Sequence, residues 1–167
     1  MAKKVVWTSI FTLVAIILQS TLLYRLAPYE AVPDLALGIL VYSAYMNSAM
    51  TGQFSGFFSG LFLDFLSAAP LGLNTLIRTI IGAAIGRISG TFFPDALFFP
   101  MALCAGATIL KAAMLFLLHL LFREAAPFYS LYDMTFWMEL LLNTLSAPFL
   151  FALLRLFKPL LIGKEEI

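Results

Sequence analysis

The residues of this sequence that could do chemistry are ionisable or amide side chains within long apolar segments. A charge in such surroundings is costly unless it is paired, so each one marks an ion pair or a functional site. Acidic and basic groups gathered in one place could also hold a ligand. We expect one intramembrane polar cluster, formed by Asp64, Asn74, Arg78, Lys111, His119 and Glu139, with Asn143 as a further candidate.

Asp64 and Arg78 are the clearest pair in this cluster. They stand on either side of the turn Pro70-Leu71-Gly72, which brings the ends of two apolar segments together. We therefore predict a direct ion pair between them, which would reduce the cost of burial. A structural clasp, a partner or ligand site and a catalytic site all fit this pair. Lys111 needs an acidic partner of its own, because an unpaired ammonium near the middle of a membrane helix costs about 3 kcal/mol.

The sequence lacks the motifs that would make this cluster a familiar active site. Ser55 and Ser59 are expected at a different depth from His119, so they do not form a serine–histidine pair with it. There is no His-Glu-x-x-His helix, no phosphate-binding loop and no Gly-x-Ser-x-Gly turn. Cys104 is the single cysteine and offers neither a disulfide nor a metal site. We predict a protein without catalytic activity, cofactor or metal ion.

The amino-acid composition indicates that the elements which position these residues are membrane helices. The chain has 167 residues, of which 62% are hydrophobic and 11% charged, and its mean hydropathy is +0.99. An average soluble domain is about 25% charged, so this chain cannot cover a water-exposed surface. The net charge of +1 provides no basic field for nucleic acid. The bilayer is therefore the expected surroundings.

Six apolar segments fill the sequence, and together they predict an all-α bundle of six transmembrane helices in a single domain, 1–167. Pro33 suits the first turn of the second helix because it lacks an amide proton. A merged or re-entrant segment in place of the second and third helices would leave five. The basic and apolar start resembles a signal peptide but is too long, so we interpret it as a retained helix. The predicted ranges are 5–26, 33–50, 52–67, 73–91, 97–122 and 135–157.

Basic residues predict the orientation of this bundle. With six spans, one side of the membrane collects Lys3, Lys4, Arg87, Arg155, Lys158 and Lys164. The opposite side has only Arg25 and Arg123. We expect both termini in the cytoplasm of a bacterium, with the protein in its cytoplasmic (inner) membrane.

Glycines recur every four residues on two neighbouring predicted helices. Such a row lines one helical face and allows another backbone to approach closely. The two rows could face each other, or they could receive another chain, either a partner or a second copy of this one. They consist of Gly52, Gly56 and Gly60, and of Gly82, Gly86 and Gly90.

Several of these residues, taken in order, resemble the MreD family of bacterial rod shape-determining membrane proteins. Pro33-Asp34 opens the second helix, Gly56 and Gly60 lead to Asp64, and Gly86-Arg87 closes the fourth helix. The central motif is Pro70-Leu71-Gly72-Leu73-Asn74. Thr75 replaces the alanine that the family usually has at that position, which is a mild departure. The length and the short loops extend the resemblance over nearly the whole chain.

The resemblance implies a scaffold of the elongasome, the machinery of cell elongation, rather than an enzyme. Proteins of this family associate directly with MreC, a membrane protein with one span and an outer domain. Through that complex they are connected to the MreB filament, to the peptidoglycan synthase RodA and to its class B penicillin-binding protein. The family fold is similar to the six-helix substrate-binding component of energy-coupling factor transporters.

Two other functions compete with the scaffold. The first is a vitamin-binding transporter component, whose polar cavity the predicted cluster could line. Such components often carry an Ala-x-x-x-Ala stripe on the first helix for docking, and here that helix has Ala15 alone. The second is a lipid-handling enzyme or flippase, which would need the cluster to open sideways to lipid.

Overall fold

The computed structural model describes residues 1–23, 32–67, 69–90, 97–123 and 133–162. These residues contain helices and no strand, which confirms the all-α prediction. The α-helices are α1 (Ala2–Leu18), α3 (Leu35–Met46), α4 (Ala49–Leu66), α5 (Leu73–Arg87), α6 (Phe98–Leu121), α7 (Met134–Leu156) and α8 (Lys158–Leu161). A short π-helix, η1 (Gln19–Leu23), continues α1.

Each of the six predicted ranges contains one long helix, but several boundaries differ. The helix α3 ends at Met46 because Ser48 is extended and its hydroxyl accepts from the Thr51 amide to begin α4. The chain therefore has two helices here, not one merged segment. Pro33 precedes the helix instead of opening it, because Asp34 is the N-cap of α3. Arg25, Lys164 and residues 24–26 and 91 lie outside the described residues.

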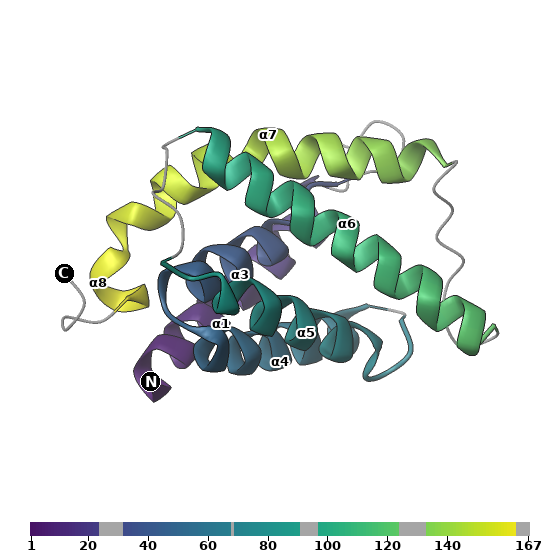
Figure 1. The fold of residues 1–167 in the computed structure, drawn as a ribbon, viewed down its shortest axis with the longest axis horizontal. Helices are drawn as coiled ribbons and strands as arrows, with labels where there is room; N and C mark the ends of the chain where they lie inside the picture. Colours follow the sequence, from purple (N-terminus) through teal and green to yellow (C-terminus); the bar gives the residue numbers. More distant parts are fainter. Residues whose placement is uncertain (24–31, 68, 91–96, 124–132, 163–167) are drawn as a thin grey trace.

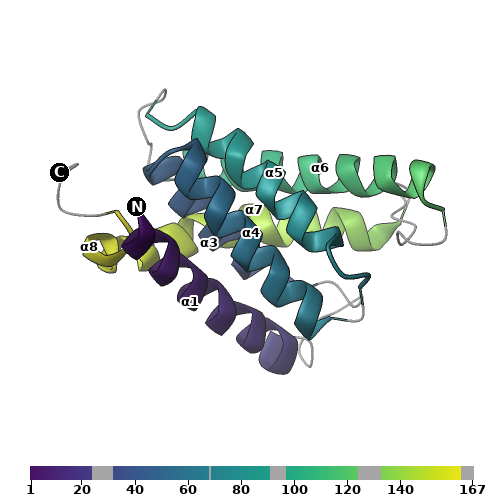
Figure 2. The ribbon, with the colours of Figure 1, turned by 90° about the horizontal axis from the view of Figure 1, so that it is seen from below.

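The helix α3 lies in the middle of the bundle, and both views show the other long helices around it (Figures 1 and 2). It contacts α1, α4, α5, α6 and α7. The helices α4 and α5 run side by side along their length, and α6 pairs with α7 (Figure 2). The short helix α8 returns to α1, where the rings of Phe11 and Phe157 are 5.1 Å apart.

The distribution of side chains differs from that in a soluble bundle, because apolar side chains form both the core and the outer surface. Polar side chains are buried between the helices, among them Thr8, Ser43 and Ser59, which are fully buried. Large apolar side chains instead cover the outside, for example Ile109, Phe116, Leu117, Leu145 and Phe149. Lipid tails accept an apolar exterior, and interior hydroxyls form hydrogen bonds between helices, as Thr8 and Ser43 do at 2.7 Å. The protein is therefore built for a membrane.

Within the described part of the chain, three helical segments are long and apolar enough to cross a bilayer, judged by their length and composition. They are Ala2–Thr21, Phe98–Leu121 and Met134–Leu156. The helix α3 is apolar but shorter, and α4 and α5 carry buried charge and glycine instead of a continuous apolar run. For α3, α4 and α5, the predicted membrane span therefore stays a prediction.

The glycine rows lie where α4 meets α5. A Cβ atom added to Gly56 would overlap the carbonyl oxygen of Arg78, and one added to Gly52 would overlap that of Gly82. Gly60 and Gly86 are blocked in the same way by backbone atoms of the facing helix. Gly90 differs: it follows the end of α5, has a left-handed φ of 71° and meets nothing within 4 Å. Five of the six glycines thus allow α4 and α5 to approach backbone to backbone.

Candidate functional site

A network of four charged side chains lies in the interior, with Asp34 at its centre. Both carboxylate oxygens of Asp34 accept hydrogen bonds from Nη2 of Arg78, at 2.7 and 2.8 Å. The second guanidinium nitrogen of Arg78 donates to Ser59 Oγ at 2.8 Å. The side chains of Arg78 and Asp34 are 3% and 8% exposed. A pair so deeply buried depends on its hydrogen bonds, because both charges have lost their water.

Lys111 connects this pair to α7. Its Nζ is 2.6 Å from Oε1 of Glu139 and 3.4 Å from Oδ2 of Asp34. Lys111 thus has the acidic partner that its position near the middle of α6 requires. The four side chains comprise two acids and two bases, so the network as a whole is electrically neutral. It joins the start of α3 to α5, α6 and α7.

Local structure holds Asp34 in place. As the N-cap of α3, its Oδ1 accepts from the Leu37 amide at 2.9 Å, a contact that satisfies one of the unpaired amides of the first turn. Its own amide donates to Asn143 Oδ1 at 2.6 Å. Asn143 Nδ2 in turn donates to Thr108 Oγ1 at 3.0 Å. The carboxylate is therefore oriented by the backbone of α3 and by side chains of α6 and α7.

The predicted ion pair between Asp64 and Arg78 is wrong. Asp64 is 2% exposed, and its oxygens accept from the backbone amides of Gly72, Asn74 and Thr75 at 3.0 Å each. The side chains of Asn74 and Thr75 donate to it as well. The first amides of a helix lack partners within the helix, and Asp64 satisfies those of α5. Arg78 lies one turn further along and turns toward α3.

The expected single cluster is therefore two separate ones. Asp64 and Asn74 stabilise the turn between α4 and α5, whereas Arg78, Lys111 and Glu139 gather around Asp34. His119 lies eight residues beyond Lys111 on α6, about 12 Å along the axis at 1.5 Å per residue. In the turn motif, Gly72 has the left-handed φ of 94° that favours glycine, and Pro70 O accepts from the Leu73 amide. Leu71 and Arg87 are exposed.

The sequence analysis did not place Asp34 in the polar cluster, nor the two hydroxyl residues Ser59 and Thr108 that bond to Arg78 and Asn143. Asp34 was assigned to the family motif and to the start of a helix, not to the polar cluster. Ser59 and Thr108 are hydroxyl residues in apolar helices, where they commonly bond to their own backbone. One signal was present for Asp34: Lys111 had no named acidic partner, and pairing with an acid is the expected way to lower the cost of a buried base.

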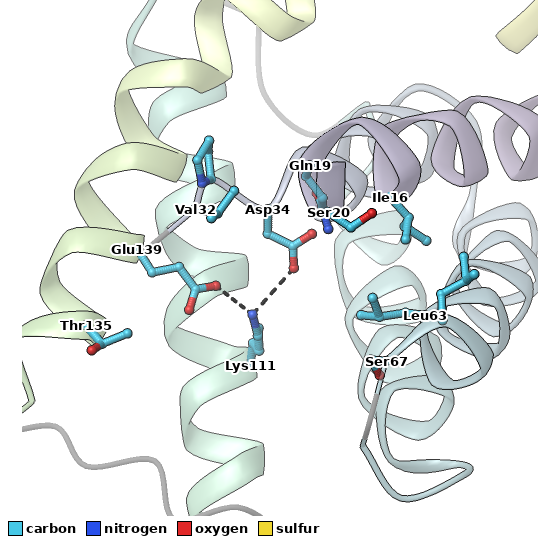
Figure 3. A pocket seen from close by; sticks show the side chains of 12 residues that line it. Ile16, Gln19, Ser20, Val32, Asp34, Leu63, Ser67, Lys111, Thr135 and Glu139 are labelled. Carbon is cyan, nitrogen blue, oxygen red and sulfur yellow. Dashed lines mark hydrogen bonds and ion pairs between the residues drawn. The ribbon is translucent and has the colours of Figure 1, made fainter. Parts of the chain in front are cut away.

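A cavity of about 350 Å³ opens beside the network (Figure 3). Lys111, Glu139 and Asp34 line one side of it, and Gln19 and Ser20 from η1 line another (Figure 3). The remaining lining residues are Ile16, Val32, Pro33, Leu63, Leu66, Ser67 and Thr135. Lys111 is the most accessible of the charged groups, with 21% of its side chain exposed.

The arrangement of these charged groups favours structural pairing or ligand recognition over catalysis. Each charged group of the network bonds to another protein group in a fixed geometry. Among the described residues, no group of three or more His, Cys, Asp or Glu side chains is arranged to hold a metal ion. Cys104 is buried beside the network and is not disulfide-bonded.

Comparison with known proteins assigns the chain to a family. A family model described as rod shape-determining protein MreD matches residues 1–157. No curated protein and no solved structure matches the chain. The matched range contains both polar clusters, the glycine contact and the cavity. The chain therefore belongs to the MreD family of rod shape-determining membrane proteins.

Proposed function

We propose that this protein is a non-catalytic scaffold of the elongasome that binds MreC and helps to control cell shape and lateral peptidoglycan synthesis. The observation that carries the proposal is the family match over residues 1–157. MreC is the direct partner. MreB, RodA and the class B penicillin-binding protein are reached through the complex, and the bilayer surrounds the bundle.

The described structure supports a scaffold in two ways. The four charges of the network pair with one another and Asp64 bonds to the start of α5, so these groups favour a single arrangement of the helices. The outer surface is apolar along the whole length of several helices, which suits contact with another membrane helix. We further propose that six helices span the bacterial inner membrane and that both termini are cytoplasmic, as the distribution of basic residues predicts.

The groove between α1 and α4 is the surface that we assign to the transmembrane helix of MreC. Two adjoining apolar hollows of about 470 and 230 Å³ share Val5, Val6 and Phe58. Phe54 and Ile10 extend the groove along the two helices. Without a hydrophobic driving force in lipid, helices associate through close van der Waals packing, and a groove offers more of it than a convex face.

Co-purification tests this function. The tagged chain is co-expressed with MreC from the same organism and recovered in mild detergent, with an unrelated single-span membrane protein as the control partner. Val6→Trp fills the groove, and Leu145→Trp makes the same kind of change on α7. The two side chains are matched, at 55% and 53% exposed.

A stoichiometric complex that Val6→Trp weakens and Leu145→Trp leaves intact would support the scaffold and the groove. If both variants lose MreC equally, or if both retain it, the groove is rejected as the binding surface but the complex is not. Absence of MreC from a monodisperse eluate would reject the scaffold. The vitamin-binding transporter component would then be tested by thermal shift; the family match is our reason for placing it second.

A further inference from the structure

Basic side chains gather at one end of the bundle, where they have no role in the scaffold contact. This end holds the first turn of α1, the last turns of α5 and α7, and α8, and it lies at the left of both views (Figures 1 and 2). Its bases are Lys3, Lys4, Arg87, Arg155 and Lys158. Within the described part of the chain, every acid lies toward the other end of the bundle: Asp34, Asp64, Asp133 and Glu139.

The positive excess at this end remains when the whole sequence is counted. The predicted topology adds four residues to this side that lie outside the described ones: the base Lys164 and the acids Asp95, Glu165 and Glu166. Five described bases and one further base stand against three acids, which leaves three net positive charges. A ligand of this end is therefore favoured if it is an anion.

Arg155 and Lys158 form a pair of bases within this end. Arg155 is in the last turn of α7, and Lys158 begins α8. The Phe157 amide between them donates to the Leu154 carbonyl, so the backbone keeps a helical turn, and residues three apart on a turn are neighbours. Both side chains are exposed, and within the described residues neither forms an ion pair, in contrast to the bases of the buried network.

The first turn of α1 brings a third base to the same side. The helix α8 contacts α1, and the rings of Phe11 and Phe157 are 5.1 Å apart. Lys3, Trp7 and Phe11 are four residues apart, so they lie on one face of α1, the face that meets α8. Trp7 is half-buried next to Phe11. Tryptophan is typical of the head-group level of a membrane, which places Lys3 at that level too.

An apolar row leads away from the basic pair along α7. It consists of Phe149, Leu153 and Leu156, whose spacings of four and three keep them on one helical face. Their side chains are 79%, 54% and 75% exposed. An exposed apolar row with bases at its end matches a phospholipid, because an acyl chain packs on the row while the phosphate meets the bases. A soluble acidic peptide would leave the row unused.

The bases determine which phospholipid is favoured. Guanidinium and ammonium groups form short, charge-assisted hydrogen bonds with phosphate oxygens. Basic residues beside a membrane surface attract anionic lipids, whereas a zwitterionic lipid brings its own positive charge to the same place. The preferred lipid therefore carries a net negative charge on its head group.

We propose that Arg155 and Lys158 bind the phosphate of an anionic phospholipid from the surrounding bilayer. Lys3 contributes a further positive charge from α1, and an acyl chain of the lipid lies along the apolar row of α7. Phosphatidylglycerol and cardiolipin share this chemistry, with one and two phosphates. The inference rests on the proposed membrane span of α7 and does not depend on binding to MreC.

Lipid binding to the purified full chain tests the proposal. The protein in a neutral detergent is titrated with phosphatidylglycerol, cardiolipin or phosphatidylcholine, and native mass spectrometry measures the fraction with bound lipid. We expect the anionic lipids to be retained and phosphatidylcholine to be lost. The affinity for the anionic lipids should fall when salt is raised, because salt screens exposed charges. Retention of cardiolipin alone would support a site that needs both phosphates.

Substitutions of exposed bases locate the site. Arg155→Gln should weaken binding of the anionic lipid roughly fivefold, since one base near a membrane surface contributes about 1 kcal/mol. Adding Lys158→Gln should bring the loss to about 25-fold. Arg123→Gln is the matched control, because it removes an exposed arginine beyond the end of α6, at the opposite end of the bundle. Arg87→Gln removes an exposed arginine at the same end, on α5. Neither control should change the affinity more than about twofold.

Equal retention of phosphatidylcholine and the anionic lipids would overturn the proposal. So would an unchanged affinity in the variant that lacks both Arg155 and Lys158. If Arg87→Gln weakens binding as much as Arg155→Gln does, the whole end attracts lipid and the site on α7 and α8 is rejected. All these side chains are exposed, so the variants should keep the circular dichroism of the wild type. A negative outcome leaves the co-purification test of the scaffold unaffected, because the groove lies between α1 and α4.

Discussion

The charge network is most directly tested by replacing Asp34 with asparagine. The substitution removes one negative charge while keeping the size of the side chain and an oxygen that can still cap α3. Arg78 would then be buried, at 3% exposed, without an acidic partner. Lys111 would keep Glu139, 2.6 Å away.

The expected loss follows from the geometry of the pair. Arg78 Nη2 contacts both oxygens of Asp34, at 2.7 and 2.8 Å. Removing one partner of a buried ion pair typically costs about 3–5 kcal/mol, because the other charge is left uncompensated. We therefore expect Asp34→Asn to lower the free energy of unfolding by that amount. Adding Arg78→Met should recover part of the loss, which gives a coupling energy of about 1–3 kcal/mol.

The assay is reversible unfolding of the purified chain in mixed micelles, with increasing SDS and far-UV circular dichroism as the signal. The cycle compares the wild type, the two single variants and the double variant. A second cycle pairs Asp64→Asn with Arg78→Met and serves as the control. We expect its coupling energy to be the smaller one, since Asp64 bonds to the start of α5 and not to Arg78.

Two results would refute this reasoning. One is a loss below about 1 kcal/mol for Asp34→Asn, which would mean that Arg78 does not depend on this carboxylate. The other is a coupling energy in the Asp64 cycle that equals that of the Asp34 cycle. In that case Arg78 would interact with Asp64 as strongly as with Asp34, and the ion pair between Asp64 and Arg78 that the sequence predicted would exist after all.

Three further predictions concern packing, the turn and topology. Gly56→Leu should destabilise the bundle by about 1–3 kcal/mol, as overpacking does. Gly106→Leu is the control and should be nearly neutral, because no atom lies within 4 Å of its added Cβ. Equal melting temperatures for the two variants would contradict the glycine contact. Asp64→Asn should lower the free energy of unfolding by about 2 kcal/mol in the same assay, because its second oxygen is replaced by an amide donor that faces the amides of Gly72 and Thr75. A change within about 0.5 kcal/mol, the effect of an ordinary surface substitution, would argue against the capping role of Asp64. Reporter fusions at either terminus should be active only in the cytoplasm, and activity outside the membrane would overturn the proposed orientation.

The sequence predicted the helices well because their signals are local. Apolar runs and the turn Pro70-Leu71-Gly72 each depend on residues next to one another. The break between the second and third helices was predicted between residues 50 and 52, and it lies at Asn47-Ser48. The glycine rows were also informative, since a spacing of four keeps small residues on one helical face. Gly90 continues that spacing in the sequence, but α5 ends at Arg87. Gly90 therefore lies beyond the helix and takes no part in the contact.

The polar partners were harder to predict because they depend on how the helices are rotated against one another. Nearness to the same turn suggested Asp64 for Arg78. Asp64 instead bonds to the amides at the start of α5, because these amides have no partner within the helix and lie next to the Asp64 carboxylate. Arg78 is on the side of α5 that faces α3, and no local pattern reveals that direction. Only the assembled bundle brings Asp34 to it, across 44 residues of sequence.

The glycine contact and the ion pair meet in one residue, and this links packing to the network. The carbonyl of Arg78 lies against Gly56, while its guanidinium reaches Ser59 on α4 and Asp34 at the start of α3. A side chain at position 56 would push α5 away from α4 and draw the guanidinium off both partners. Part of the cost of Gly56→Leu is then the weakened ion pair. That part disappears where the pair has already been removed, so the same substitution should cost less in the Asp34→Asn, Arg78→Met background than in the wild type.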